Sequence, residues 1–573
     1  MEENKKGTKD RSIFYKGNYG NFIVSVIFTV LFAGANIAVS FVLKDLMDVA
    51  YNKDMQQFKR VIVTTIVILL AASMIGLIKL ITTNRYIKKA SEQFKNHVFE
   101  MIMKKNINSF NEESLSTYLS AFSNDLSQIE GKYLGGNLLI INNITLFVGS
   151  ALAMAYMNLK IFGIAIGTCL IPIVISIIMG PKVEDMEKKV SNSNANFIAL
   201  TKDILAGFTV VKSFRATKEI AQVFSKKNVE LEGVKRKARD TEGIIETIND
   251  IAGMLVSVTV IGTGVFFAVK GVITAGVVIA YIDLLNYLLE PISELGVEFA
   301  NRGAAIALID KLYTVAEENA TSDKKEIITE FKDSIVYENV CFGYEKEQLN
   351  LCDINLKIEK GKSYAIVGSS GSGKSTLLNL LLGYHDNYSG SLRLDNHELK
   401  ELNSDSLYDI ISTIQQNVFV FDNSIVDNIT LFKQFSKGKI DQVVKQAGLE
   451  KLIEDKGNDY NCGENGSNLS GGEKQRISIA RSLIRNSPII LMDEATAALD
   501  TKTSFIVEDT ILSINGLTKI IITHKMNRTL LKKYDQIVVM SEGRIVEKGT
   551  FEQLMMQKGH FYSMNAIANS VNE

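Results

Sequence analysis

Tryptophan is absent from this chain of 573 residues, and proline, cysteine and histidine are scarce, with 4, 4 and 5 copies. Without tryptophan, any aromatic anchoring at a membrane surface falls to tyrosine and phenylalanine. The cysteines have neither CxxC nor metal-ligand spacing, so we expect four free thiols whose main role is packing: Cys169, Cys341, Cys352 and Cys462. An excess of one charge is also lacking, because 63 Lys and Arg face 64 Asp and Glu. Since a protein that neutralises many phosphates needs a basic surplus, nucleic acid is not expected as a partner.

Apolar residues, by contrast, make up 46% of the chain and form long runs in its first half. Six of these runs occupy residues 21–43, 61–81, 136–157, 161–179, 250–269 and 272–289. Each is close to the roughly 20 residues with which a helix crosses a bilayer. One such run is often a buried helix of a soluble domain. Six of them within 300 residues, without intervening strands, predict a helical membrane domain.

Basic residues indicate how the predicted spans are oriented. They cluster before the first span and again after the fourth, at Lys5, Lys6, Lys9, Arg11 and Lys16, and at Lys182, Lys188, Lys189, Lys226, Lys227, Lys235, Arg236, Lys237 and Arg239. Positive flanks stay in the cytoplasm, and an even number of spans returns the chain to its starting side, so both termini are expected there. The segments 82–135 and 180–249 are long, charged and helical in composition, and paired helices of that length would extend about 40 Å from a bilayer.

The composition divides the chain into four parts. A short cytoplasmic segment, 1–20, precedes the membrane domain, 21–316, and a polar stretch, 317–333, follows as a linker. From 334 to 573 strand-like and helical segments alternate, which predicts helices flanking a mixed sheet. The expected architecture is a six-span α-helical membrane domain followed by an α/β domain.

A glycine-rich motif in the second domain predicts nucleotide binding. It reads Gly368, Ser369, Ser370, Gly371, Ser372, Gly373, Lys374, Ser375 and Thr376. A strand-like run, 364–367, precedes it and a helix-like run, 377–382, follows it, which is the context that a phosphate loop requires. Backbone N–H groups of such a loop surround phosphates, the lysine supplies a point charge, and the serine hydroxyl binds Mg²⁺. The motif therefore predicts that the α/β domain is a phosphate-loop domain that binds ATP with Mg²⁺.

Two further motifs carry groups suited to hydrolysis. Ser470-Gly471-Gly472 stands before a helix that begins near Glu473, so its N–H groups form a second anion site. Asp493 and Glu494 follow the apolar run 489–492. A carboxylate at such a strand end can hold Mg²⁺ through water, and its neighbour can orient or deprotonate an attacking water.

The order of these motifs resembles that of a known family. The phosphate loop, Leu469-Ser470-Gly471-Gly472, Asp493-Glu494, Leu499-Asp500 and Thr523-His524 follow one another as in the nucleotide-binding domain of ATP-binding-cassette transporters. The six spans before them are similar to those of an exporter-type half-transporter, so the resemblance covers nearly the whole chain. It implies ATP hydrolysis coupled to the export of an amphipathic drug, lipid or peptide.

The resemblance also implies roles for single residues. Tyr344 matches the aromatic residue that stacks on adenine. Gln416, rather than the neighbouring Gln415, matches the glutamine that contacts Mg²⁺. Glu494 matches the catalytic carboxylate and His524 the histidine that contacts the γ-phosphate.

A dimer follows from the same resemblance. In the family, the motif Ser470-Gly471-Gly472 faces the γ-phosphate held by the opposite subunit, so a working ATPase needs two half-transporters, as a homodimer or a heterodimer. Glu473 stands where the family usually has glutamine, and a carboxylate near that phosphate would slow hydrolysis. The segments 114–125 and 206–214 resemble the two coupling helices, and Glu464 resembles part of a short element that contacts the cytoplasmic arms.

Acidic residues in and after the last predicted span are candidates for substrate contact. Four of them share one helix face within about 80°: Asp283, Glu290, Glu294 and Glu298. Counted from the start of the span, Asp283 lies about 16 Å deep, near the bilayer midplane, and Glu290 lies near the inner boundary. An acid at the depth of Asp283 is either a counter-charge for a cationic substrate or a hydrogen-bond partner of neighbouring helices, and both interpretations stay open. Lys79 and Asp250 can pair with each other or with Glu290.

The ATP motifs do not decide the direction of transport. Some transporters with an exporter-like fold are importers, and a channel or regulator gated by ATP is a further alternative, against which the complete catalytic set argues. The abundance of Lys, Asn and Ile favours a bacterial source. We therefore expect a multi-pass protein of a bacterial plasma membrane that contacts membrane lipid and a small-molecule or peptide substrate.

Overall fold

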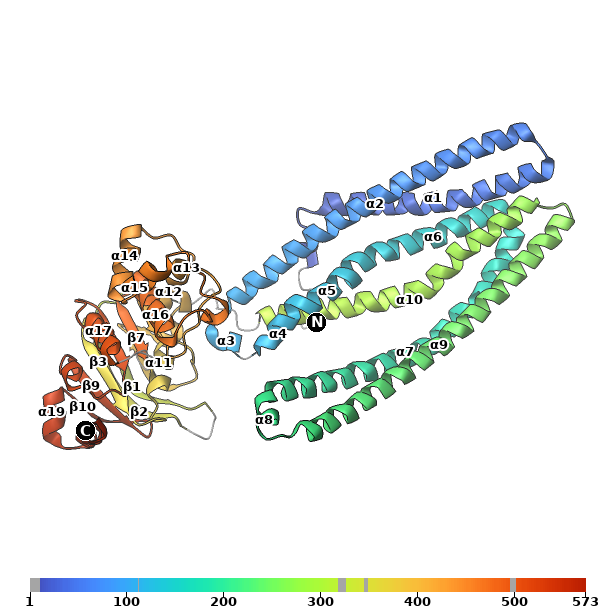
Figure 1. Cartoon of the computed structure of the whole chain (residues 1–573). Coiled ribbons are helices and arrows are strands. Elements are labelled where there is room, and N and C mark those ends of the chain that lie inside the picture. Colours follow the sequence, from blue (N-terminus) through green and yellow to red (C-terminus); the bar gives the residue numbers. More distant parts are fainter. Residues whose placement is uncertain (1–10, 112, 318–325, 345–348, 495–500, 573) are drawn as a thin grey trace. The chain divides into compact units, whose positions relative to one another are not determined.

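The computed structural model describes residues 11–111, 113–317, 326–344, 349–494 and 501–572. Contacts between residues divide the chain into two units (Figure 1). The helical unit comprises Met1–Met103 and Glu113–Glu317. The sheet unit comprises Lys104–Glu112 and Glu318–Glu573.

The helical unit is built from long helices. They are η2 (Arg11–Phe14), α1 (Tyr19–Asn52), α2 (Met55–Met103), α4 (Leu115–Ser120), α5 (Leu126–Ile129), α6 (Gly136–Met157), α7 (Leu159–Ala206), α8 (Phe208–Ser213), α9 (Thr217–Val269) and α10 (Ala275–Glu317). Two π-helical segments, Ala121–Asp125 and Glu130–Gly135, join α4, α5 and α6 into one run. Among the described residues, five helices are long and apolar enough to cross a membrane: Tyr19–Asn52, Met55–Met103, Thr117–Met157, Thr217–Val269 and Ala275–Ala316. The remaining predicted span falls in α7, whose apolar part, Leu159–Ile175, is shorter.

Two sets of helices form the helical unit. Helix α1 packs against α2, α6 and α10, whereas α7 packs mainly against α9. Figure 1 shows α7 and α9 side by side, with α8 at the end of the pair. The Tyr281 hydroxyl donates to the carbonyls of Met154 and Asn158 over 2.6 and 2.8 Å, which ties α10 to the turn between α6 and α7.

The surface of α2 is unusual for a helix in water. The most apolar stretch of Met55–Met103 has a mean hydropathy of 2.7, and none of it is buried within the chain. An exposed apolar surface of this length is long enough to cross the hydrocarbon core of a bilayer, which would cover it. The helical unit is therefore a multi-pass membrane domain.

The residues that lead into α1 are folded onto this unit. Phe14 is fully buried, with its ring centroid 4.7 Å from that of Phe94 and 5.4 Å from that of Tyr133. The side-chain amide of Asn18 donates to the Tyr86 carbonyl over 3.1 Å. The start of α1 is thus attached to α2 and to the segment before α6.

The sheet unit alternates strands and short helices. Its strands are β1 (Ser334–Phe342), β2 (Leu351–Glu359), β3 (Ser363–Gly368), β4 (Ser389–Leu394), β5 (His397–Glu398), β6 (Ile411–Ile414), β7 (Ile489–Asp493), β8 (Thr518–Ile522), β9 (Gln536–Ser541) and β10 (Arg544–Gly549). Its helices are α3 (Ile107–Asn111), α11 (Lys374–Leu381), α12 (Ser404–Ile410), α13 (Ile425–Thr430), α14 (Lys437–Gln446), α15 (Glu450–Lys456), α16 (Gly471–Arg485), α17 (Thr501–Leu512), α18 (Arg528–Leu531), α19 (Phe551–Gln557) and α20 (His560–Asn572).

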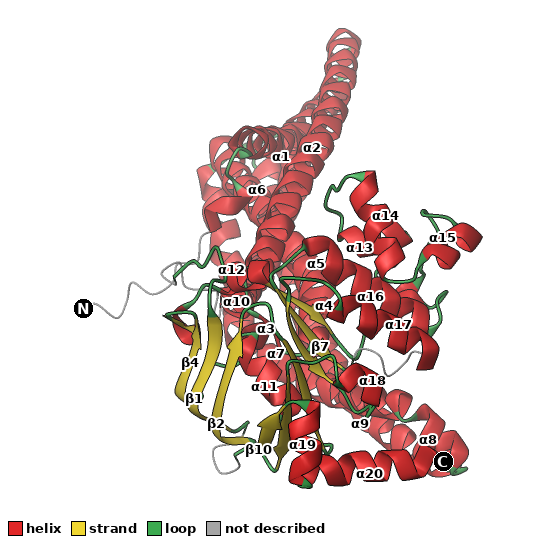
Figure 2. Cartoon of the chain, turned by 90° about the vertical axis from the view of Figure 1, so that its left-hand side faces the viewer, coloured by secondary structure: helices red, strands yellow, loops and turns green. Residues whose placement is uncertain are grey.

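The strands form two sheets, visible in yellow in Figure 2. One is antiparallel, with the order β2-β1-β4-β5, and the other has the order β10-β9-β3-β8-β7-β6. In the second sheet, β3 pairs in parallel with β8 and β9, and β7 pairs in parallel with β6 and β8. Every residue of β3 is buried, as expected for a central strand covered on both faces. Because β3, β7 and β8 are parallel, their carboxyl ends meet at one edge, where ligands of open α/β sheets bind.

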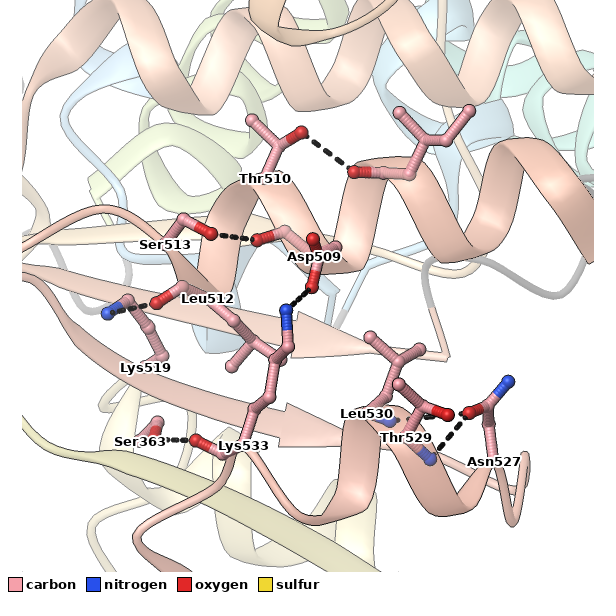
Figure 3. A network of polar contacts seen from close by, with 11 residues as sticks. Ser363, Asp509, Thr510, Leu512, Ser513, Lys519, Asn527, Thr529, Leu530 and Lys533 are labelled. Atoms are coloured by element: carbon pink, nitrogen blue, oxygen red, sulfur yellow. Dashed lines mark hydrogen bonds and ion pairs between the residues drawn. The ribbon is translucent and has the colours of Figure 1, made fainter.

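Polar contacts connect α17 to the second sheet and to the segment after α18 (Figure 3). The Asp509 carboxylate of α17 pairs with the Lys533 ammonium group. The Lys519 ammonium group of β8 donates to the Leu512 carbonyl over 3.1 Å, so the C-terminus of α17 carries a cation at its free carbonyls. These contacts hold α17, the helix that follows β7, in its position beside the sheet.

The two segments expected to be coupling helices differ in structure. Residues 206–214 contain the short helix α8, but residues 114–125 form the start of the run that leads into α6. The short helix that groups with the sheets is instead α3. Asn108 of α3 and the preceding Asn106 line a pocket together with Tyr384 and Lys400. The interpretation of 114–125 as a coupling helix was therefore wrong. The short helix that groups with the sheets, α3, ends a few residues before that segment.

Candidate nucleotide-binding site

The phosphate loop connects β3 to α11. Gly373 has a φ of 96°, and a Cβ there would lie 2.8 Å from Leu351 Cδ2, so both its backbone conformation and its close packing favour glycine. Lys374 is only 5% exposed, and its Nζ donates to the carbonyls of Gly368 and Ser369 over 3.0 and 2.7 Å. Burial lowers the pKa of Lys374, and the nearby carboxylates of Glu494 and Asp493 partly oppose this. The loop therefore surrounds a cation, which suits it to bind phosphate.

Ser375 and Asp493 form the candidate Mg²⁺ site. The Ser375 hydroxyl at the start of α11 donates to Asp493 Oδ1 at the end of β7 over 3.2 Å. Burial raises the pKa of Asp493, the Ser375 hydroxyl lowers it and Glu494 raises it further. The described residues contain no cluster of three or more His, Cys, Asp or Glu that would enclose a metal. Hydroxyl and carboxylate oxygens fit Mg²⁺, which takes its other ligands from nucleotide phosphates and water.

Glu494 lies between two other predicted site residues. Its carboxylate accepts a hydrogen bond from Gln416 Nε2 over 3.0 Å, and its other oxygen lies 2.6 Å from His524 Nε2. The side chains of Glu494 and His524 are 24% and 42% exposed, so both reach solvent and are accessible to a substrate. Glu494 follows β7, His524 follows β8 and Gln416 follows β6, so the edge of the parallel sheet brings the three together.

The structure also separates Gln415 from Gln416. The Gln415 carbonyl accepts from Gln475 Nε2 over 3.2 Å, and its side chain bonds to Tyr384. Consecutive side chains of an extended segment point in opposite directions. Only Gln416 therefore faces Glu494.

Tyr344 lies next to α11, the helix that follows the phosphate loop. Its ring is 54% exposed and makes edge contacts with Phe342 and His385, at centroid distances of 5.1 and 5.3 Å. Its hydroxyl lies 3.5 Å from Thr376 Oγ1 in α11. An exposed ring next to the phosphate loop is suited to stack on a purine.

His385 was missed by sequence reasoning, because no local motif marks it. Its ring stacks on Phe342 at 4.9 Å, behind Tyr344. Burial lowers the pKa of His385, and Asp386 partly opposes this. His385 therefore belongs to the same aromatic cluster as Phe342 and Tyr344.

The second anion motif caps α16. Ser470 Oγ accepts the Glu473 N–H over 3.3 Å, and Glu473 Oε2 accepts the Ser470 N–H over 2.7 Å, which forms a capping box. Burial raises the pKa of Glu473, but the bonds to Ser470 and the charges of Lys456 and Arg476 outweigh it, so the net pKa is lowered. Glu473 therefore stabilises the start of α16, and its carboxylate is turned back onto the motif.

Two other predicted elements are Leu499-Asp500 and Glu464. Leu499-Asp500 falls outside the described residues. Glu464 begins the short 3-10 helix Glu464–Gly466 and is exposed. Neither contributes to the geometry above.

The acids of α10 have helical partners. Asp283 Oδ2 accepts from the buried Ser40 hydroxyl of α1 over 2.5 Å, and Glu294 Oε2 accepts from Asn143 Nδ2 of α6 over 2.8 Å. Lys79 of α2 donates to Asn142 Oδ1 of α6 over 3.3 Å. The bond from Ser40 is a hydrogen bond to a neighbouring helix, as the structural interpretation of Asp283 requires. This bond uses one of the two carboxylate oxygens of Asp283.

Comparison with known protein families gives one match in the membrane domain and one in the sheet unit. Residues 22–292 match the ABC transporter transmembrane region, and residues 351–497 match the ABC transporter domain. This chain belongs to the ATP-binding-cassette transporters. As an ABC transporter it is an ATPase that couples hydrolysis to transport through its membrane domain.

Similar proteins span nearly the whole transporter. An ATP-dependent lipid A-core flippase of Yersinia pestis is 27% identical over 555 residues, 95% of each chain. The flippase of Escherichia coli is 28% identical over 482 residues, 82% of each chain. A solved bacterial Atm1-family ABC exporter with ATP bound has a TM-score of 0.79 at 21% identity and covers 96% of this chain and 98% of its own, which shows the same fold.

Proposed function

We propose that this ABC transporter works as a dimer of half-transporters and exports an amphipathic substrate, of the lipid or lipid-like class, across a bacterial plasma membrane. The observation that carries the proposal is the complete hydrolytic set, in which Glu494 contacts both Gln416 and His524, in a chain that also contains the membrane domain. A channel or regulator gated by ATP does not need that set. The termini are proposed to be cytoplasmic, because the basic flanks favour it.

The dimer follows from the count of motifs. One chain carries one phosphate loop and one Ser470-Gly471-Gly472 motif. In the family a site is completed by the opposite subunit, so two chains are needed. Both catalytic groups are present in this chain, so a homodimer would have two competent sites, and a heterodimer is equally possible in structural terms.

Each residue of the site is proposed to have a separate role in hydrolysis. Lys374 and the N-terminus of α11 bind the phosphates, and Tyr344 stacks on the base. Glu494 accepts the proton of the attacking water, while His524 and Gln416 hold its carboxylate in place. Ser375 and Asp493, with Gln416 nearby, would hold Mg²⁺, which would neutralise phosphate charge.

The substrate class rests on the relatives. Two of them are named flippases of lipid A-core, and the similarity covers nearly the whole chain. At 27–28% identity we transfer the class, an amphipathic lipid with a polar headgroup, and not the particular glycolipid. The exposed apolar surface of α2 is compatible with a substrate that enters from the bilayer.

Transport by purified protein in liposomes tests the proposal. With the ATP sites facing outward, ATP is expected to drive a headgroup-labelled lipid, or an amphipathic dye, from the outer leaflet toward the lumen, because that direction corresponds to export. The variant Glu494→Gln in the same liposomes is the control for passive movement. ATP-driven movement in the reverse direction would show an importer, and steady ATP turnover without movement of any amphipath would contradict transport of this class.

A second proposal concerns Asp283 and, nearer the inner boundary, Glu290 as acids that face the substrate path. Asp283 keeps one carboxylate oxygen beyond its bond to Ser40, so it can serve both neighbours and a cation. Asp283→Asn is expected to reduce transport of cationic amphipaths at least about fivefold more than that of neutral ones, since the loss of one close charge pair at a desolvated site costs about 1 kcal/mol or more. Transport assays of matched cationic and neutral compounds measure this ratio.

Ser40→Ala is the matched control for Asp283→Asn. It removes the hydrogen bond to Asp283 but leaves the carboxylate, whereas Asp283→Asn removes the charge and keeps an oxygen that can accept from Ser40, so Ser40→Ala is expected to change transport of both classes equally. Equal losses in both variants would assign Asp283 to helix packing alone.

A further inference from the structure

Two cysteines of the antiparallel sheet lie opposite each other. Val340 pairs with Ile354 and Phe342 pairs with Leu351, so Cys341 of β1 stands opposite Cys352 and Asp353 of β2. Two residues opposite one is a β-bulge, and Asp353 has a φ of 53°, as expected for such an irregularity. The flanking pairs are all buried, whereas Cys341 and Cys352 are partly exposed, so both thiols are on the outer face of the sheet.

The backbone hydrogen bonds of both cysteines are made with other segments. Cys341 pairs with Ser389 of β4, and the Cys352 N–H donates to the Gly543 carbonyl over 2.9 Å, so both backbones bond away from each other. Residues that stand opposite each other in an antiparallel pair have Cα atoms about 4.5–5.5 Å apart, within the roughly 4.4–6.8 Å that a disulfide spans, and the bulge places Cys352 and Asp353 together opposite Cys341. The Cys341 sulfur already accepts the Asp353 N–H over 3.1 Å, which places it one residue from Cys352.

A cation accompanies one of the thiols. The Arg544 guanidinium donates to Cys352 Sγ over 3.5 Å. A positive charge at that position stabilises the negative charge that develops on a sulfur during thiol–disulfide exchange. By contrast, Cys169 and Cys462 are buried, and burial raises the pKa of the Cys462 thiol, so that thiol is protected from the same chemistry.

The pair is connected to the ATP site through short contacts. Tyr344, three residues after Cys341, donates its N–H to the Asn350 side chain over 3.0 Å. Gly543, which accepts from Cys352, donates its own N–H to the Ser372 carbonyl in the phosphate loop over 3.2 Å. Leu351, next to Cys352, packs on Gly373 of the same loop. A change at the bulge is thus transmitted to both the base-stacking and the phosphate-binding parts.

We propose that Cys341 and Cys352 form a reversible redox site that takes a low-molecular-weight disulfide, such as oxidised glutathione, and lowers the affinity of the cassette for ATP when oxidised. The Cys352 thiolate attacks the reagent disulfide and releases one thiol, which leaves a mixed disulfide on Cys352. The Cys341 thiolate then attacks the Cys352 sulfur and releases the second thiol. Two cysteine thiols lose two protons and two electrons, and the reagent is reduced to two thiols. This inference uses only the ATP-binding role of the cassette and is independent of the transported substrate.

The expected effect on nucleotide binding has a structural cause. A cross-link draws Cys341 Sγ away from the Asp353 N–H and closes the bulge. Asn350 and Leu351, which hold Tyr344 and the phosphate loop, shift with it. We expect the Kd for ATP to rise about three- to tenfold, a change of roughly 0.7–1.4 kcal/mol.

Peptide mapping of the full-length transporter in lipid nanodiscs tests the bond. Trypsin cleaves after Lys346, so Cys341 and Cys352 fall in the separate peptides 333–346 and 347–357. After treatment with oxidised glutathione and alkylation of the remaining thiols, these two peptides are expected to be joined, and dithiothreitol is expected to separate them. Recovery of both peptides as alkylated thiols, or of glutathione adducts without a linked pair, would overturn the proposal.

Binding of a fluorescent ATP analogue tests the consequence. The oxidised protein is expected to bind three- to tenfold more weakly than the reduced protein, and dithiothreitol is expected to restore the affinity. The double variant Cys341→Ser, Cys352→Ser retains Cys169 and Cys462 and is expected to give the same affinity with and without the oxidant. A linked pair with unchanged affinity, or an equal response in the double variant, would contradict the regulatory role.

Discussion

Glu494→Gln is expected to lower steady-state ATP turnover by about 10²–10⁴-fold, because the amide cannot accept a proton from the attacking water. The amide keeps the shape of the side chain and can still bond to Gln416 and His524, whose contacts of 3.0 and 2.6 Å hold that position. ATP affinity is expected to stay within about threefold, since the carboxylate acts on the water rather than on the bound phosphates.

Phosphate release measures the turnover, and equilibrium binding of labelled ATP measures the affinity. Glu454→Gln is the matched control, because Glu454 is an exposed carboxylate of α15 for which no part in the site is proposed, and its turnover is expected to stay at the wild-type level. Turnover of Glu494→Gln close to that of the wild type would show that another group deprotonates the water.

Lys374→Met is expected to weaken ATP binding by about 10–100-fold, that is by roughly 1.4–2.8 kcal/mol. The methionine keeps most of the length of the buried stem, so the change removes a charge without leaving the space that alanine would leave. Burial lowers the pKa of Lys374, so its charge is held at a cost in stability, but the variant also loses two hydrogen bonds to loop carbonyls, so it is expected to unfold at about the same temperature as the wild type.

Titration calorimetry with ATP and a thermal melt of the same preparation separate the two effects. Lys374→Ala is expected to lose at least as much affinity and, in addition, to melt at a lower temperature because of the cavity. ATP affinity of Lys374→Met equal to that of the wild type would show that Lys374 does not contact the phosphates.

The local motifs of the cassette could be predicted from the sequence for a physical reason. A phosphate loop depends on positive φ angles and on a strand and a helix directly beside it, and these are properties of about fifteen consecutive residues. The apolar runs were equally informative, since the length of a span is set by the bilayer rather than by a partner. The helices predicted in the long segments 82–135 and 180–249 also depend on local composition.

The sequence by itself therefore determined that this chain has a helical membrane domain, an ATP-binding cassette and the residue types of a hydrolytic site. Only the tertiary structure decided which side chains meet. It turned Gln416 rather than Gln415 toward Glu494, gave Asp283 a partner in Ser40, folded Glu473 back onto Ser470, and set Cys341 opposite Cys352. Conformation within a motif depends on neighbouring residues, whereas a contact between distant segments depends on strand register and helix packing, which no short stretch of sequence encodes.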